Sequence, residues 1–215
     1  MFDLYSRDLE FFKLYHHTEK INCPGFCQGG ITQKVTIVNE RLTKIAASIG
    51  LFTGGIFGMA GSFLTSATLR NLAWGIDGVG LILATALLTI YYFRKGLDTT
   101  AAGCLIFAIG EGLILSSSGL DLNSNVSSFG AGTSLWAASL FVTSLQKTYA
   151  LFIRCTGLAA AILFSVAAVQ IFSAQPTNAL TKPLPFYAYP IFVITIFGWA
   201  WTLLDKGSRQ QAKRD

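Results

Sequence analysis

Long intervals without a charged side chain constrain the fold of this sequence more than any other feature. Four intervals contain no lysine, arginine, aspartate or glutamate, and they cover residues 45–69, 122–146, 155–181 and 183–204. Two more, 71–93 and 99–120, each contain a single acidic residue. Each interval is about as long as the roughly 20 residues that a helix needs to cross a bilayer. The pattern therefore predicts membrane-spanning helices.

Composition excludes most of the alternatives. Apolar residues make up 52% of the chain and charged residues only 13%, with a mean hydropathy of +0.53. The charged share is about half of what soluble domains carry, which is too little to coat the surface of a water-soluble globule. The 21 glycines follow no fixed period and there are only 4 cysteines, so collagen-like and disulfide-rich scaffolds are excluded as well.

We therefore predict an all-α fold, a polytopic membrane protein whose bundle of six transmembrane helices forms three hairpins within residues 45–204. Residues 1–44 are expected to form a cytoplasmic N-terminal tail with an amphipathic helix, and residues 205–215 a basic cytoplasmic C-terminal tail. The fourth span is the weakest because serine, threonine and asparagine dilute it, and a five-span chain is the alternative. The predicted spans are about 45–67, 72–93, 99–119, 130–146, 149–172 and 184–204.

The basic residues predict the orientation of the bundle. With six spans, all but three of the 16 lysines and arginines fall on the side of the two termini. Arg70 and Lys182 lie on the other side, and Arg154 lies inside a span. Cytoplasmic loops carry the excess of positive charge, so both termini are expected in the cytoplasm of a multi-pass protein of the cell membrane. The net charge of +5 thus needs no nucleic-acid partner.

The N-terminal tail carries two features of its own. Residues 1–15 place polar and apolar side chains on opposite faces of a helix, which favours a helix lying on the inner membrane surface or docked on a protein. The same residues lack the continuous apolar core of a cleavable signal peptide. Cys23 and Cys27, with His16 and His17 nearby, are candidates for a metal site or for lipidation, but an unmodified tail is favoured and we expect no metal and no cofactor.

Two further patterns concern helix packing and the membrane interface. Gly50, Gly54 and Gly58 are spaced by four and form a flat strip, which favours close helix packing inside the bundle over a homodimer face. In the last span, tyrosine at 187 and 189 and tryptophan at 199 and 201 are expected to anchor the two membrane interfaces.

Two acidic residues inside the spans are the candidate ion- or solute-binding residues. Glu111 lies about 12 residues into its span, or roughly 18 Å deep, and Asp77 belongs to the same, outer half of the bilayer. A carboxylate at such depth is costly and usually faces a bundle interior or a watery cavity. The structural alternative is a hydrogen bond of Glu111 with Ser117, Asn123 or Trp74. Arg154 belongs to the inner half and is expected to extend to lipid headgroups.

Two functions follow from these residues. The first is translocation of a cation, a proton or a small polar solute through an outward-facing acidic site made by Glu111 and Asp77. The alternative is a non-catalytic subunit or assembly factor of a larger membrane complex, for which the amphipathic tail and the glycine strip are suitable. The sequence contains no Walker A, G-x-S-x-G or H-E-x-x-H motif, so an enzyme is the less expected class, and a membrane enzyme acting on lipid ranks third. The expected partners are the lipid bilayer and, for the alternative, other membrane subunits.

Overall fold

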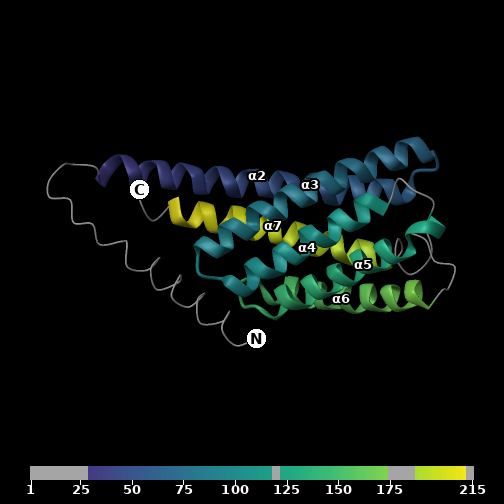
Figure 1. Cartoon of the computed structure of the whole chain (residues 1–215). Helices are drawn as coiled ribbons and strands as arrows, with labels where there is room; N and C mark the ends of the chain where they lie inside the picture. The colour runs from purple at the N-terminus through teal and green to yellow at the C-terminus, as the bar shows by residue number, and fades with distance from the viewer. Residues whose placement is uncertain (1–28, 118–121, 174–186, 212–215) are drawn as a thin grey trace, which may run out of the picture. The chain divides into compact units, whose positions relative to one another are not determined.

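The computed structural model describes residues 29–117, 122–173 and 187–211, and in these residues the chain forms helices and short connections without a strand. The predicted all-α class is confirmed. The amphipathic segment 1–15, with His16, His17, Cys23 and Cys27, lies outside the described residues. The chain divides into two compact units, residues 1–36 and 37–215, and the helix bundle belongs to the second. The described helices are α2 (Gly29–Phe63), whose residues up to Thr36 belong to the first unit, α3 (Ala67–Arg94), α4 (Asp98–Ser117), α5 (Leu122–Leu145), α6 (Leu151–Phe172) and α7 (Tyr189–Gln211) (Figure 1).

Four of the helices are long and apolar enough to cross a membrane. They are the part of α2 from Glu40 to Phe63, together with α3, α4 and α6. The apolar part of α7, Tyr189–Asp205, is shorter. Large apolar side chains such as Leu83, Leu151 and Ile162 are exposed along these helices, as expected for side chains that face lipid. These features indicate a membrane protein.

The glycine strip of α2 packs inside the bundle, against α3. A Cβ atom added to Gly50 would lie 2.8 Å from the carbonyl oxygen of Gly80 and 2.9 Å from the Cβ of Ala84. At Gly54 it would lie 2.5 Å from the side chain of Leu81. Only glycine permits this approach of the two backbones, so the predicted internal packing of the strip is confirmed.

The buried hydroxyl groups of helix α5 donate hydrogen bonds to backbone carbonyls. The hydroxyls of Thr133 and Thr143 donate hydrogen bonds of 2.8 Å to carbonyls one turn earlier in α5, and Ser139 donates a bond of 2.7 Å to the carbonyl of Gly103 in α4. All three side chains are buried. Their hydroxyls are therefore satisfied without water, which explains how a helix rich in serine and threonine packs between α4 and α6.

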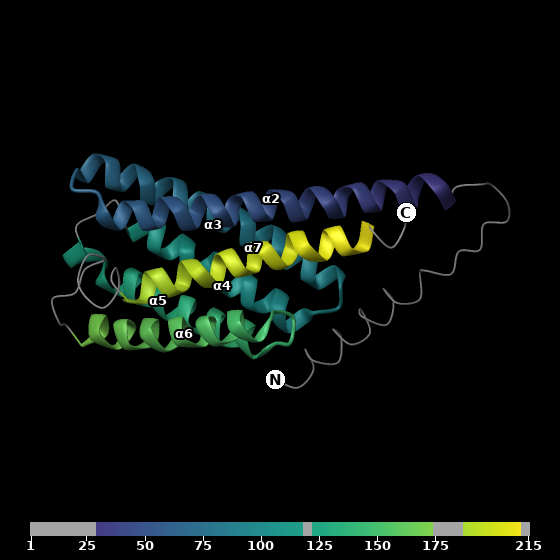
Figure 2. The same ribbon diagram turned by 180° about the vertical axis from the view of Figure 1, so that it is seen from behind.

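Helix α7 contacts all five of the other described helices. Figure 2 shows it in yellow, running between α2 and α6. Trp199 is 1% exposed, so its expected place at the membrane interface was wrong, whereas Trp201 is 70% exposed. Pro190 falls in the first turn, where its missing N–H costs no helical hydrogen bond. The contacts join Ala200 to Ser48 of α2, Tyr189 to Asp77 of α3, Phe192 to Phe107 of α4 and Trp136 of α5, and Thr195 to Thr156 of α6.

Candidate functional site

Asp77 and Glu111, the two residues predicted from the sequence, meet in the interior of the bundle. They come from the adjacent helices α3 and α4, and their side chains are 4% and 3% exposed. A Cβ atom added to Gly78, the neighbour of Asp77, would lie 3.2 Å from Oε1 of Glu111. The two carboxyl groups are close enough to interact electrostatically. Both acids thus line one buried site, as expected for costly intramembrane carboxylates.

Tyr189 and Trp136 complete this site, which we call the acidic site (Asp77, Glu111, Tyr189 and Trp136). The hydroxyl of Tyr189, at the start of α7, donates a hydrogen bond of 2.7 Å to Oδ2 of Asp77. The indole of Trp136, on α5, lies beside Glu111, but its Nε1 makes no hydrogen bond of good geometry. The site therefore draws one side chain from each of four helices.

Glycines of α2 cover the acidic site. A Cβ atom at Gly58 would meet both Oη of Tyr189 and Oδ2 of Asp77, and one at Gly54 would lie 3.2 Å from Oδ1 of Asp77. The strip that packs α2 on α3 therefore also brings bare backbone against the carboxyl group. A larger residue at either position would displace the acid or its tyrosine partner.

Three polar atoms of the acidic site are buried without a hydrogen-bond partner: Oδ1 of Asp77, Oε2 of Glu111 and Nε1 of Trp136. Neither acid forms a salt bridge with a basic side chain of the described residues. Native structures leave few buried polar atoms unpaired, and such atoms call for a strained, catalytic or ligand-binding explanation. The site thus has more acceptors than donors and no positive charge of its own.

Aromatic rings surround the acidic site on the side of Trp136. The indole stacks on Phe107 at 5.7 Å and on Phe192 at 5.1 Å, and meets the edge of Phe164 at 5.1 Å between ring centroids. Tyr189 contacts Phe192 at 5.6 Å. This apolar wall excludes water from the acids, and electrostatic interactions are strengthened in such surroundings.

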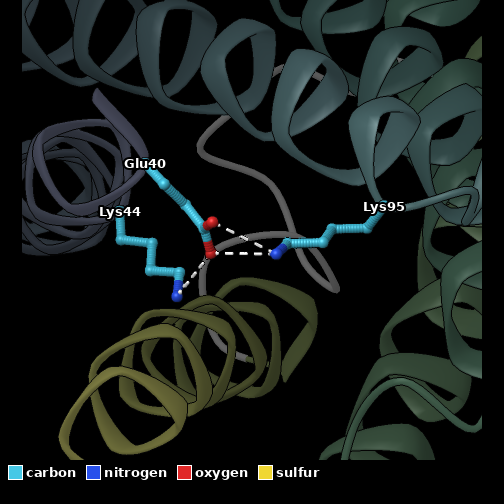
Figure 3. Close-up of polar contacts among 3 residues, drawn as sticks. All are labelled: Glu40, Lys44 and Lys95. Carbon is cyan, nitrogen blue, oxygen red and sulfur yellow. Dashed lines mark hydrogen bonds and ion pairs between the residues drawn. The ribbon is translucent and has the colours of Figure 1, made fainter. Parts of the chain in front are cut away.

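A second charged cluster joins α2 to the connection between α3 and α4. The carboxylate of Glu40 lies 3.0 Å from Nζ of Lys44 and 3.1 Å from Nζ of Lys95 (Figure 3). Both ammonium groups also lie over the ring of Tyr91, 5.4 and 5.8 Å from its centroid. Lys44 is only 7% exposed, so Glu40 neutralises a nearly buried charge. The sequence analysis missed this cluster: the i,i+4 spacing of Glu40 and Lys44 is a signal that could have predicted that pair, but no pattern in the sequence links either residue to Lys95.

Two of the three hydrogen bonds predicted as structural alternatives for Glu111, those with Ser117 and Trp74, do not form, and the third, with Asn123, is not tested. The Ser117 hydroxyl donates to the carbonyl of Ile114, and Trp74 lies against Arg70, while the side chain of Asn123 is outside the described part. Arg154 donates through Nε to the carbonyl of Ser144, at 2.8 Å, and through Nη2 to that of Leu145, at 3.2 Å. It thus satisfies the last carbonyls of α5, and its contact with lipid headgroups stays a prediction.

Sequence reasoning missed Tyr189 and Trp136. Tyr189 was predicted at the membrane interface with Tyr187, but it is 9% exposed while Tyr187 is 53% exposed. A tyrosine near the start of an apolar helix is equally typical of an interface anchor, so only the tertiary contact with Asp77 separates the two roles. No local pattern marked Trp136, whose role depends on the packing of α5 against α4.

Metal binding and similarity to other proteins add no further constraint. Within the residues that the structure describes, no group of three or more histidine, cysteine, aspartate and glutamate side chains could hold a metal ion. Comparison with protein-family models, with curated proteins and with solved structures finds no match for this chain. Any function must therefore be argued from the acidic site itself.

Proposed function

We propose that this protein translocates a proton, another cation or a small polar solute across a membrane through the acidic site. The observation that carries the proposal is the pairing of Asp77 with Glu111 in the bundle interior, with two unpaired carboxyl oxygens and no basic partner among the described residues. Acidic residues that face the interior of a transmembrane bundle commonly mark ion pathways and proton relays.

We further propose that the chain crosses the membrane six times, with both termini in the cytoplasm. Packing supports this: α5 lies between the long apolar helices α4 and α6, and α7 contacts every other described helix. The buried hydroxyl bonds of α5 remove the objection that its sequence is too polar. The distribution of lysine and arginine supports the orientation.

Flux measurements in liposomes test the proposed function. Purified protein is reconstituted with an imposed gradient of protons, and separately of sodium, potassium or an organic cation. Wild-type protein should give flux above protein-free liposomes, and Glu111→Gln and Asp77→Asn should lower it to that background because each removes an ionisable oxygen pair from the site.

Asp98→Asn is the matched control for these variants. Asp98 begins the same helix as Glu111 but is exposed, so the same loss of charge there should leave the flux unchanged. Each variant must retain its helical circular dichroism and a single elution peak. Wild-type protein that gives no flux for any of these species, or a folded Glu111→Gln variant with full flux, contradicts the proposal.

A further inference from the structure

We propose that the ligand of the acidic site is a proton, held on Glu111 and shared with Asp77. This inference rests on the proposed function and names its cargo. It follows from the hydrogen-bonding balance of the site, from the ligands that the site offers to a metal ion, and from the covering of its aromatic faces.

The balance of donors and acceptors in the site is completed by one added proton. Oδ2 of Asp77 already accepts a hydrogen bond from Tyr189, so this oxygen serves as an acceptor in the site. Oδ1 of Asp77 and Oε2 of Glu111 remain unpaired. A proton on Glu111 adds one donor to the site, and the indole N–H of Trp136 is the other donor without a partner. The site then holds two such donors for its two unpaired carboxyl oxygens.

The site offers too few oxygens for a metal ion. Hard cations such as Ca²⁺ take six to eight oxygen ligands, and Mg²⁺ requires six in an octahedron. Here the side chains supply the carboxyl groups of Asp77 and Glu111 and the hydroxyl of Tyr189. Transporters that bind Na⁺ usually add carbonyls from unwound helix segments, but α3 and α4 are continuous helices through both acids. Their carbonyls are therefore engaged within the helices.

An organic cation would need an open aromatic face, and the aromatic faces here are covered. Ammonium ions are recognised by ring faces that they can approach within about 6 Å. The ring of Trp136 is stacked on those of Phe107 and Phe192, and Tyr189 packs on Phe192. These rings pack against one another and leave no open face for an ammonium group. The acids are therefore surrounded by apolar surface, and a proton is the one cation that needs no additional space.

The described groups that face the two acids include no competing charge. Tyr189 comes from α7 and is a neutral donor, and Trp136 from α5 does not titrate. Helix α2 presents the glycines Gly54 and Gly58, and α6 reaches this region through Phe164, which packs on Trp136. A change in protonation of the site is therefore a property of the pair Asp77 and Glu111.

Infrared spectroscopy of the reconstituted full chain at neutral pH tests the inference directly. A protonated carboxyl group gives a C=O stretch that is separate from the bands of carboxylates and amides. We expect wild-type protein to show this band, Asp98→Asn to retain it, and Glu111→Gln to lose it. Labelling with ¹³C-glutamate should shift the band, which assigns it to a glutamate even if Glu111→Gln does not fold. Replacing the other three glutamates, Glu10, Glu19 and Glu40, by glutamine then leaves Glu111 as the only labelled side chain.

Cation exchange separates a proton from its competitors in the same experiment. Replacing sodium by potassium, calcium or tetramethylammonium should leave the band unchanged. Loss of the band on adding one of these cations, or absence of any glutamate band, overturns the inference. If sodium flux depends on Glu111 but no band of a protonated carboxyl group is seen, the inference of a bound proton is contradicted and the proposed translocation function still stands. If the band of a protonated carboxyl group is seen in a protein that gives no flux, the inference of a bound proton is supported and the proposed translocation function is contradicted.

Discussion

At the scale of single residues, the acidic site depends on one hydrogen bond from outside the two helices that carry the acids. Tyr189 is the only described side chain that donates a hydrogen bond to Asp77, and Asp77 is almost completely buried. A buried acceptor that loses its donor retains the full cost of its desolvation. Tyr189 is thus a positioning residue for Asp77.

Tyr189→Phe should destabilise the protein by about 1–3 kcal/mol, because it leaves the buried Oδ2 of Asp77 without its donor. Thermal unfolding of the purified protein, followed by circular dichroism in one detergent, measures the change. Tyr187→Phe is the matched control, since that tyrosine is exposed and should unfold at the wild-type temperature. Equal unfolding temperatures for the two variants would show that the bond to Asp77 contributes no stability.

Single residues also mark the limit of what the sequence predicts. Glu111 and Asp77 were identifiable because a carboxylate within an apolar interval is conspicuous. The proximity of the two acids could not be predicted from the sequence, since it depends on the register of α3 against α4. Tyr189 and Trp199 were assigned to the membrane interface by residue type, but side-chain direction around α7 decides burial, and aromatic residues suit both places. The helices themselves could be predicted well, because apolar intervals of this length have few other solutions in a bilayer.

At the scale of helices, α2 controls the acidic site through the absence of side chains. Gly54 and Gly58 place the backbone of α2 against Asp77 and Tyr189. The same glycines therefore determine both the packing of α2 on α3 and the geometry of the site. A substitution in α2 can displace the acidic side chains without altering an ionisable group.

Gly58→Ala should destabilise the bundle by about 1–3 kcal/mol through overpacking and should lower any flux that depends on Glu111. The added methyl group would occupy the position of the Tyr189 hydroxyl and of Oδ2 of Asp77. Gly112→Ala makes the same change next to Glu111, where nothing lies within 4 Å of the new atom, and should be neutral or stabilising by up to about 1 kcal/mol. Thermal unfolding and liposome flux of both variants check this, and a Gly58→Ala variant with wild-type flux would disprove the coupling.

At the scale of the whole molecule, the orientation in the membrane decides which solution the acidic site faces. The site lies nearer to the connection between α2 and α3 than to the one between α3 and α4, since Gly58 and Glu111 are each within two turns of the helix ends Phe63 and Ser117. With six spans and cytoplasmic termini, those ends belong to the outer surface.

Cysteine labelling tests this orientation. Ser66→Cys and Leu97→Cys place thiols at exposed positions in the two connections on either side of α3. A membrane-impermeant maleimide should label Ser66→Cys on intact cells and Leu97→Cys only after the membrane is opened, with the unsubstituted chain as the baseline. The opposite pattern would invert the proposed topology, and labelling of both from one side would mean that α3 does not cross the membrane.

The position of α7 in the chain has a consequence for assembly. The helix that contacts all the other described helices is synthesised after them, so on the proposed six-span topology α2 to α6 enter the bilayer before Tyr189 exists to bind Asp77. Until then a nascent chain holds an acid in the membrane without its donor, and the arrival of α7 removes this defect. The hydrogen bond between Tyr189 and Asp77 is thus also the signature of a finished bundle, which a quality-control protease could distinguish from a truncated one.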